Sequence, residues 1–294
     1  MKRLIAVVLV SFVSGGALAD MLGGWSAFEA GDYATALSEL TPPAEQGDAE
    51  AQYRLGRVYD AKGQPEEALR WYHLSAGQGN AEGQREIGVY YEEGRAVTQD
   101  FLAAACWYKA SAEQGNAKAQ RNLADLISEG KGVNHDEAAA ARWYEASAAQ
   151  GNAKAQRKLG YLYYFGVGVP KDQAKAAEFF AASAAQGVGK ASRDLGELYY
   201  YGKGVEKDLA RALGLFQTAA KEGDGDAQYY VGRMYAAGEG TERNAGEAYF
   251  WLTLSNIQDP GRARSVDLLG KLEGELSNDA MAAARQRAMQ WQPE

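Results

Sequence analysis

The sequence is poor in the residues that most often bind metals or form disulfides. Its 294 residues include one cysteine, Cys106, and two histidines, His73 and His135. A single cysteine cannot form an intramolecular disulfide, and the histidines lack the spacing of a zinc site. Cys106 lies beside Trp107 in an apolar stretch, which predicts a buried structural thiol. We expect no metal and no cofactor.

Positive charge is also scarce. The 31 basic residues are outnumbered by 39 acidic residues, which gives a formal net charge of −8. Because an acidic surface repels phosphate backbones, we expect no nucleic-acid partner.

Catalytic motifs are missing as well. The sequence contains no H-E-x-x-H, no G-x-S-x-G and no G-x-x-x-x-G-K-[ST] pattern. Glu92 and Glu93 are adjacent carboxylates, but neighbouring residues do not face each other on a helix. We predict that the protein is not an enzyme.

The one long apolar run lies at the N-terminus. Lys2 and Arg3 precede the largely apolar residues 4–13, and Ala17-Leu18-Ala19, with small residues at its first and third positions, forms a cleavage site. This pattern predicts a signal peptide over residues 1–19, too short for a transmembrane span. Its removal would change the charge to −10 (29 basic against 39 acidic residues). With no cysteine near that site and no later span, we expect a periplasmic or secreted protein without a lipid or transmembrane anchor.

A motif with a fixed period fills the rest of the chain. It contains a glycine that recurs after 32 residues and then four times after 36: Gly47, Gly79, Gly115, Gly151, Gly187 and Gly223. An aliphatic residue followed by Gly or Ala keeps the same step, at 55–56, 87–88, 123–124, 159–160, 195–196 and 231–232. Such periods indicate stacked supersecondary units that bury a core only against their neighbours.

Residues 152–187 illustrate one unit. Asn152 can cap a helix that runs to about residue 165, where apolar residues follow helical spacing. The glycine- and proline-containing segment 166–171 breaks that helix, and Asp172 caps a second one. Gly187 ends the second helix in the left-handed conformation. The unit is therefore predicted to be an antiparallel helix pair.

Other units share these features. Second-helix caps recur at Asp100, Asp136, Asp172, Asp208 and Asn244. A small residue that permits close helix approach recurs at Ala68, Ala104, Ala140, Ala176, Ala212 and Ala248.

Together these residues resemble the Sel-one-like repeat (SLR) family, a relative of tetratricopeptide repeats. The patterns A-x-x-x-L-G-x-x-Y, G-x-G-V-x-x-D, A-x-x-W-Y and A-x-Q-G-N recur over roughly residues 32–256. Departures are local: Ala96 replaces the second loop glycine, Ala124 and Ile127 replace Gly and Tyr, and Val188 replaces the capping Asn.

The resemblance implies an all-α fold, a right-handed α-solenoid of antiparallel helix pairs with helical caps. Six repeats are expected at 48–79, 80–115, 116–151, 152–187, 188–223 and 224–259. Residues 20–47 form an N-terminal capping half-repeat in this interpretation, and residues 260–294 form C-terminal capping helices. Pro42 and Pro43 are expected to interrupt or reshape the helix that contains them.

A basic stripe and an aromatic cluster mark a candidate partner-binding face. Residues spaced by three, four and seven lie on one helix face. In related solenoids the first helices line the concave surface, so we place the site there by resemblance. The predicted partner-binding residues are Lys154, Arg157, Tyr161, Tyr164, Arg193 and Tyr200. Arginine and tyrosine are the residue types in which binding energy concentrates.

A purely structural interpretation of the same residues competes with this one. Arg121 can pair with Asp125, and Arg193 with Glu197, within single helices, and the tyrosines can pack between repeats. Arg157 is favoured because no acidic residue follows it four positions later.

Three functions are compatible with these features. The first is an exported, non-enzymatic scaffold whose concave face binds a protein or peptide segment, possibly acidic, as an adaptor in a bacterial envelope complex or signalling pathway. The second is binding of cell-wall fragments or anionic glycans, with tyrosines stacked on sugar rings. The third is a secreted factor that acts on another cell.

Overall fold

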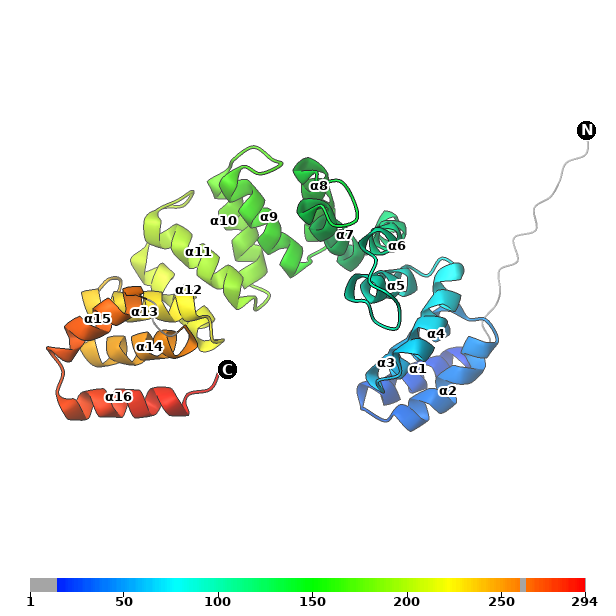
Figure 1. The fold of residues 1–294 in the computed structure, drawn as a ribbon, viewed down its shortest axis with the longest axis horizontal. Coiled ribbons are helices and arrows are strands. Elements are labelled where there is room, and N and C mark those ends of the chain that lie inside the picture. Colours follow the sequence, from blue (N-terminus) through cyan, green and yellow to red (C-terminus); the bar gives the residue numbers. More distant parts are fainter. Residues whose placement is uncertain (1–14, 260–262, 294) are drawn as a thin grey trace, which may run out of the picture. The chain divides into compact units, whose positions relative to one another are not determined.

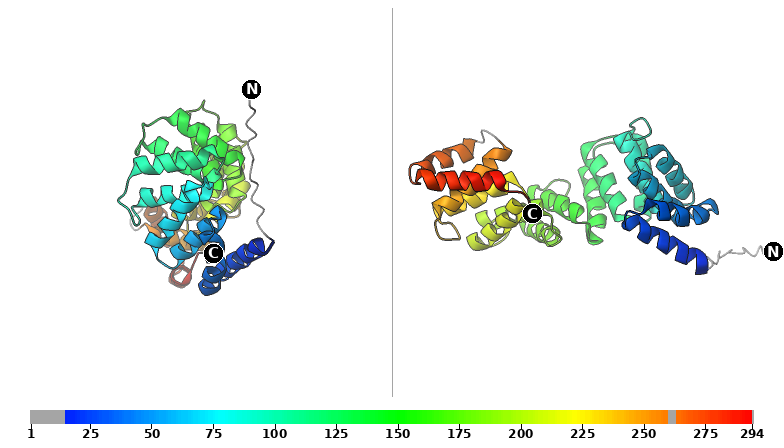
Figure 2. Two further views of the ribbon diagram at one scale, coloured as in Figure 1. Left: turned by 90° about the vertical axis from the view of Figure 1, so that its right-hand side faces the viewer. Right: turned by 90° about the horizontal axis from the view of Figure 1, so that it is seen from below.

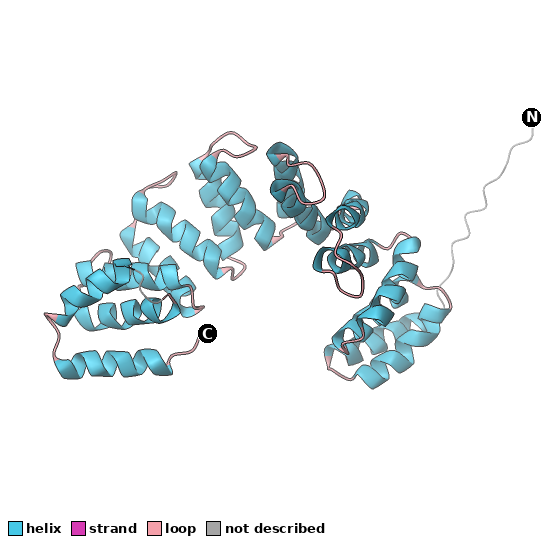
Figure 3. Ribbon diagram, viewed as in Figure 1, coloured by secondary structure: helices cyan, strands magenta, loops and turns pink. Residues whose placement is uncertain are grey.

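The computed structural model describes residues 15–259 and 263–293. Within these ranges the chain forms sixteen helices and no strand (Figures 1 and 3). Residues 1–14 of the predicted signal peptide lie outside the described part. The helices are α1 (Gly15–Glu29), α2 (Tyr33–Glu45), α3 (Ala49–Ala61), α4 (Pro65–Gly77), α5 (Ala81–Glu93), α6 (Phe101–Glu113), α7 (Ala117–Glu129), α8 (Glu137–Ala149), α9 (Ala153–Phe165), α10 (Gln173–Ala184), α11 (Gly189–Tyr201), α12 (Leu209–Lys221), α13 (Gly225–Ala237), α14 (Ala245–Gln258), α15 (Ala263–Glu273) and α16 (Asn278–Gln290).

The helices form two compact units, one ending at His135 and the other beginning at Asp136. In the first unit, each helix from α1 to α7 packs against the next one in the chain. In the second unit the same holds from α8 to α14, and both α15 and α16 pack on α14. Two further views show these pairs (Figure 2). The predicted all-α solenoid of consecutive helix pairs is confirmed.

Capping residues set the start of nearly every repeat helix. The side chain of Asn152 accepts a hydrogen bond from the N–H of Ala155 at 3.0 Å, which satisfies one of the free donors of the first turn. The predicted second-helix caps all occupy the N-cap position: Asp100, Asp136, Asp172, Asp208 and Asn244. Val188 makes no side-chain capping hydrogen bond to α11, as expected because valine has no side-chain acceptor.

The core explains why a glycine follows the aliphatic residue of the first helix in five of the six repeats, whereas α7 has Ala124 there. A Cβ on Gly160 would lie 2.6 Å from a ring carbon of Phe180 on α10. The same crowding meets Gly56 against Tyr72 and Gly88 against Tyr108. Each glycine therefore makes room for the large buried side chain of its own repeat. The alanines that recur at one position of each repeat are fully buried: Ala68, Ala104, Ala140, Ala176, Ala212 and Ala248.

A polar ladder that the sequence analysis missed links the second helix of one repeat to its own first helix. Ser183 donates from Oγ to the carbonyl oxygen of Ala153 at 2.7 Å. Gln186 donates to the side-chain oxygen of Gln156 at 2.8 Å. The serine bond recurs at Ser75, Ser111 and Ser255, and the glutamine bond at Gln78 and Gln114. These bonds satisfy polar groups that packing removes from water.

Two predictions about single residues are wrong. Pro42 and Pro43 do not interrupt α2, which continues through both. A proline's fixed φ is compatible with a helix, so the two prolines remove backbone donors without ending α2. Cys106 is exposed, because the face of α6 that packs against its neighbours carries Ala104, Ala105 and Tyr108 instead.

Candidate functional site

A cleft of about 350 Å³ lies on the first-helix face of the second unit. Three consecutive first helices, α9, α11 and α13, supply most of its wall. It is lined by Tyr161, Tyr164, Phe165, Phe180, Arg193, Asp194, Glu197, Leu198, Tyr201, Lys203, Asp226, Tyr230 and Arg264. The repeat places these residues together because equivalent positions of successive first helices lie side by side.

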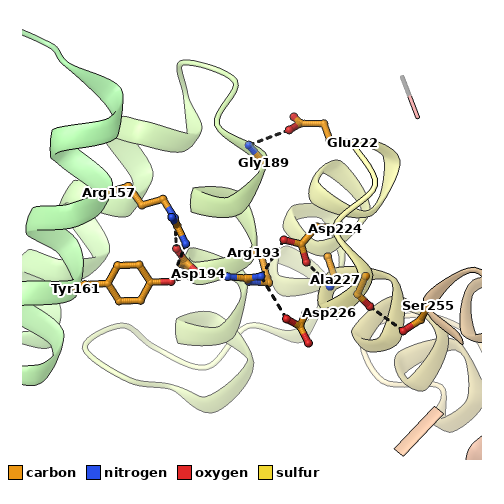
Figure 4. A network of polar contacts seen from close by, with 11 residues as sticks. Arg157, Tyr161, Gly189, Arg193, Asp194, Glu222, Asp224, Asp226, Ala227 and Ser255 are labelled. Carbon is orange, nitrogen blue, oxygen red and sulfur yellow. Dashed lines mark hydrogen bonds and ion pairs between the residues drawn. The ribbon is translucent and has the colours of Figure 1, made fainter. Parts of the chain in front are cut away.

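An ion pair between neighbouring repeats forms one wall of this cleft (Figure 4). Arg157 donates from Nε to the carboxylate of Asp194 at 2.6 Å. Tyr161 donates its hydroxyl proton to the same carboxylate at 2.8 Å and accepts from Arg157 at 2.8 Å. Burial, followed by the charge of Asp194, raises the pKa of Tyr161 to about 12. No acidic residue follows Arg157 four positions later, but Asp194 of α11 pairs with it instead.

Arg193 is bonded to three carboxylates. It lies 3.1 Å from Asp194, 2.8 Å from Asp224 and 3.4 Å from Asp226 (Figure 4). No hydrogen bond joins it to Glu197 in the described part of the chain, although Glu197 follows it by one helical turn. In contrast, the predicted pair of Arg121 and Asp125 in the first unit forms at 2.9 Å.

Glu197 differs from the other carboxylates of the cleft. Among residues 15–259 and 263–293 it has neither a hydrogen bond nor an ion pair. Burial raises the pKa of its carboxyl above the usual value, and the nearby charges of Asp194 and Asp226 act in the same direction. The charge of Arg193 opposes these effects.

Aromatic side chains form the rim of the cleft. Phe165 is 62% exposed and Tyr201 is 48% exposed, which is unusual for large apolar rings. The ammonium of Lys203 donates to the hydroxyl of Tyr164 at 2.8 Å and lies 5.1 Å from the ring centre of Tyr201. A rim of this kind presents binding area that is largely free in the isolated chain.

The structure brings only some of the predicted site residues into this cleft. Tyr161, Tyr164 and Arg193 line it, and Arg157 supports it through Asp194. Lys154 is exposed on α9 outside the lining. Tyr200 is only 5% exposed, and its hydroxyl donates to Glu239 at 2.5 Å.

Sequence reasoning missed several lining residues, chiefly Asp194, Glu197, Lys203, Asp226 and Arg264. A signal for one of them was present. Arg157 and Asp194 are separated by 37 residues, one repeat plus one position, which places opposite charges on adjacent first helices. Arg264 could not be found this way, because it lies beyond the periodic part of the sequence.

The repeat pattern matches that of a known family. The model of the Sel1 repeat matches residues 49–80, 81–116, 117–152, 153–188, 189–224 and 225–259. The chain belongs to the Sel1 repeat family. Each match starts one residue after the repeat start expected from the sequence, and each expected start is occupied by the residue before the first helix.

The chain is also similar to solved structures. A Sel1 repeat protein from Oxalobacter formigenes is 31% identical, with a TM-score of 0.70, over 80% of this chain and 96% of its own. A protective antigen from uropathogenic Escherichia coli strains with an SLR fold is 23% identical, with a TM-score of 0.49, over 94% of this chain and 85% of its own. No curated protein matches the sequence.

Sel1 repeat proteins generally act as non-catalytic scaffolds for protein interactions. Within the described residues, no group of three or more His, Cys, Asp or Glu side chains is arranged to hold a metal ion. Across the same ranges, every helix is too short or too polar to cross a bilayer.

Proposed function

We propose that this Sel1 repeat protein is an exported, non-enzymatic scaffold that binds a segment of a partner protein on the first-helix face of its second unit. It would act as an adaptor in a bacterial envelope complex or signalling pathway. The observation that carries the proposal is the cleft between α9, α11 and α13, with Phe165 and Tyr201 exposed at its rim.

The architecture of the cleft supports binding of a segment. The ion pairs of Arg157 and Arg193 join three successive first helices, from α9 through α11 to α13. Such bonds fix the side chains before a partner arrives, which lowers the entropic cost of association. Exposed aromatic rings then contribute rigid contact area, of the kind that dominates binding energy at protein interfaces.

Fewer basic residues are available to bind an acidic partner than the sequence suggested. Arg157 and Arg193 are already bonded to carboxylates of the protein itself. An acidic segment would therefore depend on other cations: Lys203 and Arg264 in the cleft lining, and the exposed amines of Lys154 and Lys190 outside it.

Export rests on the predicted signal peptide at residues 1–19. Helix α1 begins at Gly15 and continues past the expected cleavage site. Intact-mass measurement of the protein from the exported fraction tests this: a mature chain that starts at Asp20 is expected. An uncleaved chain that stays in the cytoplasm would contradict export without affecting the cleft.

Affinity purification tests the binding function. Tagged protein is recovered from the exported fraction as wild type and as the double variant Tyr164→Ala, Tyr201→Ala, with Tyr163→Ala as control. Tyr163 lies on α9 but stacks on Phe179 outside the cleft lining. A partner retained by wild type and Tyr163→Ala and lost by a folded double variant is the expected result. A partner retained equally by all three would place the interface elsewhere, and specific retention of cell-wall fragments would favour the glycan alternative.

A further inference from the structure

The charged side chains that line the cleft differ in how many hydrogen bonds and ion pairs they form. Arg193, Lys203 and Arg264 supply positive charge to its wall, and Asp194, Glu197 and Asp226 supply negative charge. Asp194 accepts bonds from two arginines and one tyrosine, and Asp226 lies 3.4 Å from Arg193. Arg193 is held by carboxylates on α11 and α13, and Arg264 lies 5.0 Å from the ring centre of Tyr229. Glu197 is thus the lining carboxylate that has no hydrogen bond or ion pair among the described residues.

The rim of the cleft already binds a cation. The Lys203 ammonium lies 5.5 Å from the ring centre of Tyr164 and 5.1 Å from that of Tyr201, within the range of cation–π attraction. Lys203 is exposed, so this contact involves little burial and its ammonium can leave for water at low cost. The flanking Gly202 and Gly204 both have positive φ, a conformation that glycine adopts without strain.

We propose that the cleft accepts one lysine or arginine side chain from the bound protein segment, which displaces Lys203 from Tyr164 and Tyr201 and pairs with Glu197. This inference rests on the proposed binding function and specifies the chemistry of the partner. The faces of aromatic rings are electronegative, so two tyrosines and a carboxylate together favour a cation over an anion or an apolar group.

The alternatives fit the cleft less well. An anionic group would meet Arg193, which is already bonded to three carboxylates, and it would have to approach Glu197. A purely apolar side chain would cover Glu197 and leave a carboxylate buried without a partner, which is costly. A volume of about 350 Å³ is at the lower end of the range for ligand pockets, so it suits a single long side chain rather than a helix.

The proposal is tested by selecting peptides that bind the full-length protein from a displayed library of random 12-residue peptides. Selections are run on wild type, Glu197→Gln, Lys203→Met and the control Glu206→Gln, whose carboxylate is exposed in the loop before α12 and outside the cleft lining. Peptides enriched on wild type are expected to share a lysine or arginine. Replacement of that residue by glutamine in a synthetic peptide is expected to weaken binding about tenfold, as is Glu197→Gln on the protein.

Lys203→Met provides the sharper readout because it should strengthen binding. Removing the internal cation frees the two rings, so binding of the selected peptides is expected to rise severalfold, whereas Glu206→Gln leaves it unchanged. Binding that is lost in Lys203→Met, or unaffected by Glu197→Gln, would overturn the proposal. Peptides that lack basic residues but require Tyr164 and Tyr201 would overturn it and leave the binding function standing. Failure of any peptide to bind the cleft would count against both.

Discussion

The carboxylate of Glu222 accepts a hydrogen bond from the backbone N–H of Gly189 at 3.0 Å (Figure 4). Gly189 begins α11, the helix whose N-cap residue, Val188, has no side-chain acceptor. Glu222 occupies the position at which other repeats carry glutamine, such as Gln186. The second helix of this repeat thus supplies the cap that its first helix lacks, and the negative charge also suits a helix N-terminus.

Glu222→Ala is expected to lower the free energy of unfolding by about 1 kcal/mol, as the loss of an N-cap does. Val188→Asn should restore a local cap and recover most of that loss in the double variant. Urea denaturation of the wild type, both single variants and the double variant measures the coupling. If the two changes were simply additive, Glu222 would not be the cap of α11.

Arg157 is expected to stabilise the stack even without a partner. Arg157→Met leaves the buried carboxylate of Asp194 with one arginine fewer, so we expect the free energy of unfolding to fall by about 1–3 kcal/mol. Lys154→Met, an exposed change on the same helix, should stay within about 0.5 kcal/mol of wild type. Equal denaturation midpoints for the two variants would show that the ion pair is energetically unimportant.

Ala96 holds a conformation that suits glycine. Its φ is +55°, the left-handed conformation that the second loop glycine adopts in other repeats, as Gly168 does at +69°. Ala96→Gly should therefore stabilise the protein by about 0.5–1 kcal/mol. The same type of substitution in a helix, Ala283→Gly in α16, should destabilise it by a similar amount. Thermal unfolding of both variants decides whether the two changes have opposite signs.

Glu197 should make stability depend on pH. The pKa of its carboxyl is higher in the folded chain than the value of 4.5 expected in the unfolded chain. At a pH between the unfolded and the folded pKa, the folded state therefore holds a proton that the unfolded state has released. Stability contributed by this group therefore falls as the pH rises through that window, and the ionised carboxylate is a net cost at neutral pH. Glu197→Gln is expected to be more stable than wild type at pH 7, with the difference shrinking towards pH 4. Urea denaturation at a series of pH values measures this, and a stability difference that stays constant from pH 4 to pH 7 would contradict a raised pKa for Glu197.

Local sequence features predicted the helices and their order well. The caps at Asp172 and Asn152 and the turn at Gly187 depend on nearby backbone geometry, which residue type and spacing report directly. Periodicity then fixed the repeat, because the same contacts between neighbours must recur at every step. The two errors, at Pro42–Pro43 and at Cys106, arose where the choice of helix face or a tolerated proline depended on neighbouring helices.

The candidate site was harder to predict because it consists of differences between repeats. The sequence by itself determined a stack of helix pairs, since capping, glycine turns and the alanine positions are local or strictly periodic. Only the tertiary structure decided that Arg157 bonds to Asp194, that Tyr200 is buried and that Glu197 lies in the cleft without a hydrogen bond to any described residue. Charged and aromatic side chains from different helices can each pair with several neighbours on this surface. Which pairs form depends on distances between helices, and these distances cannot be read from the order of residues.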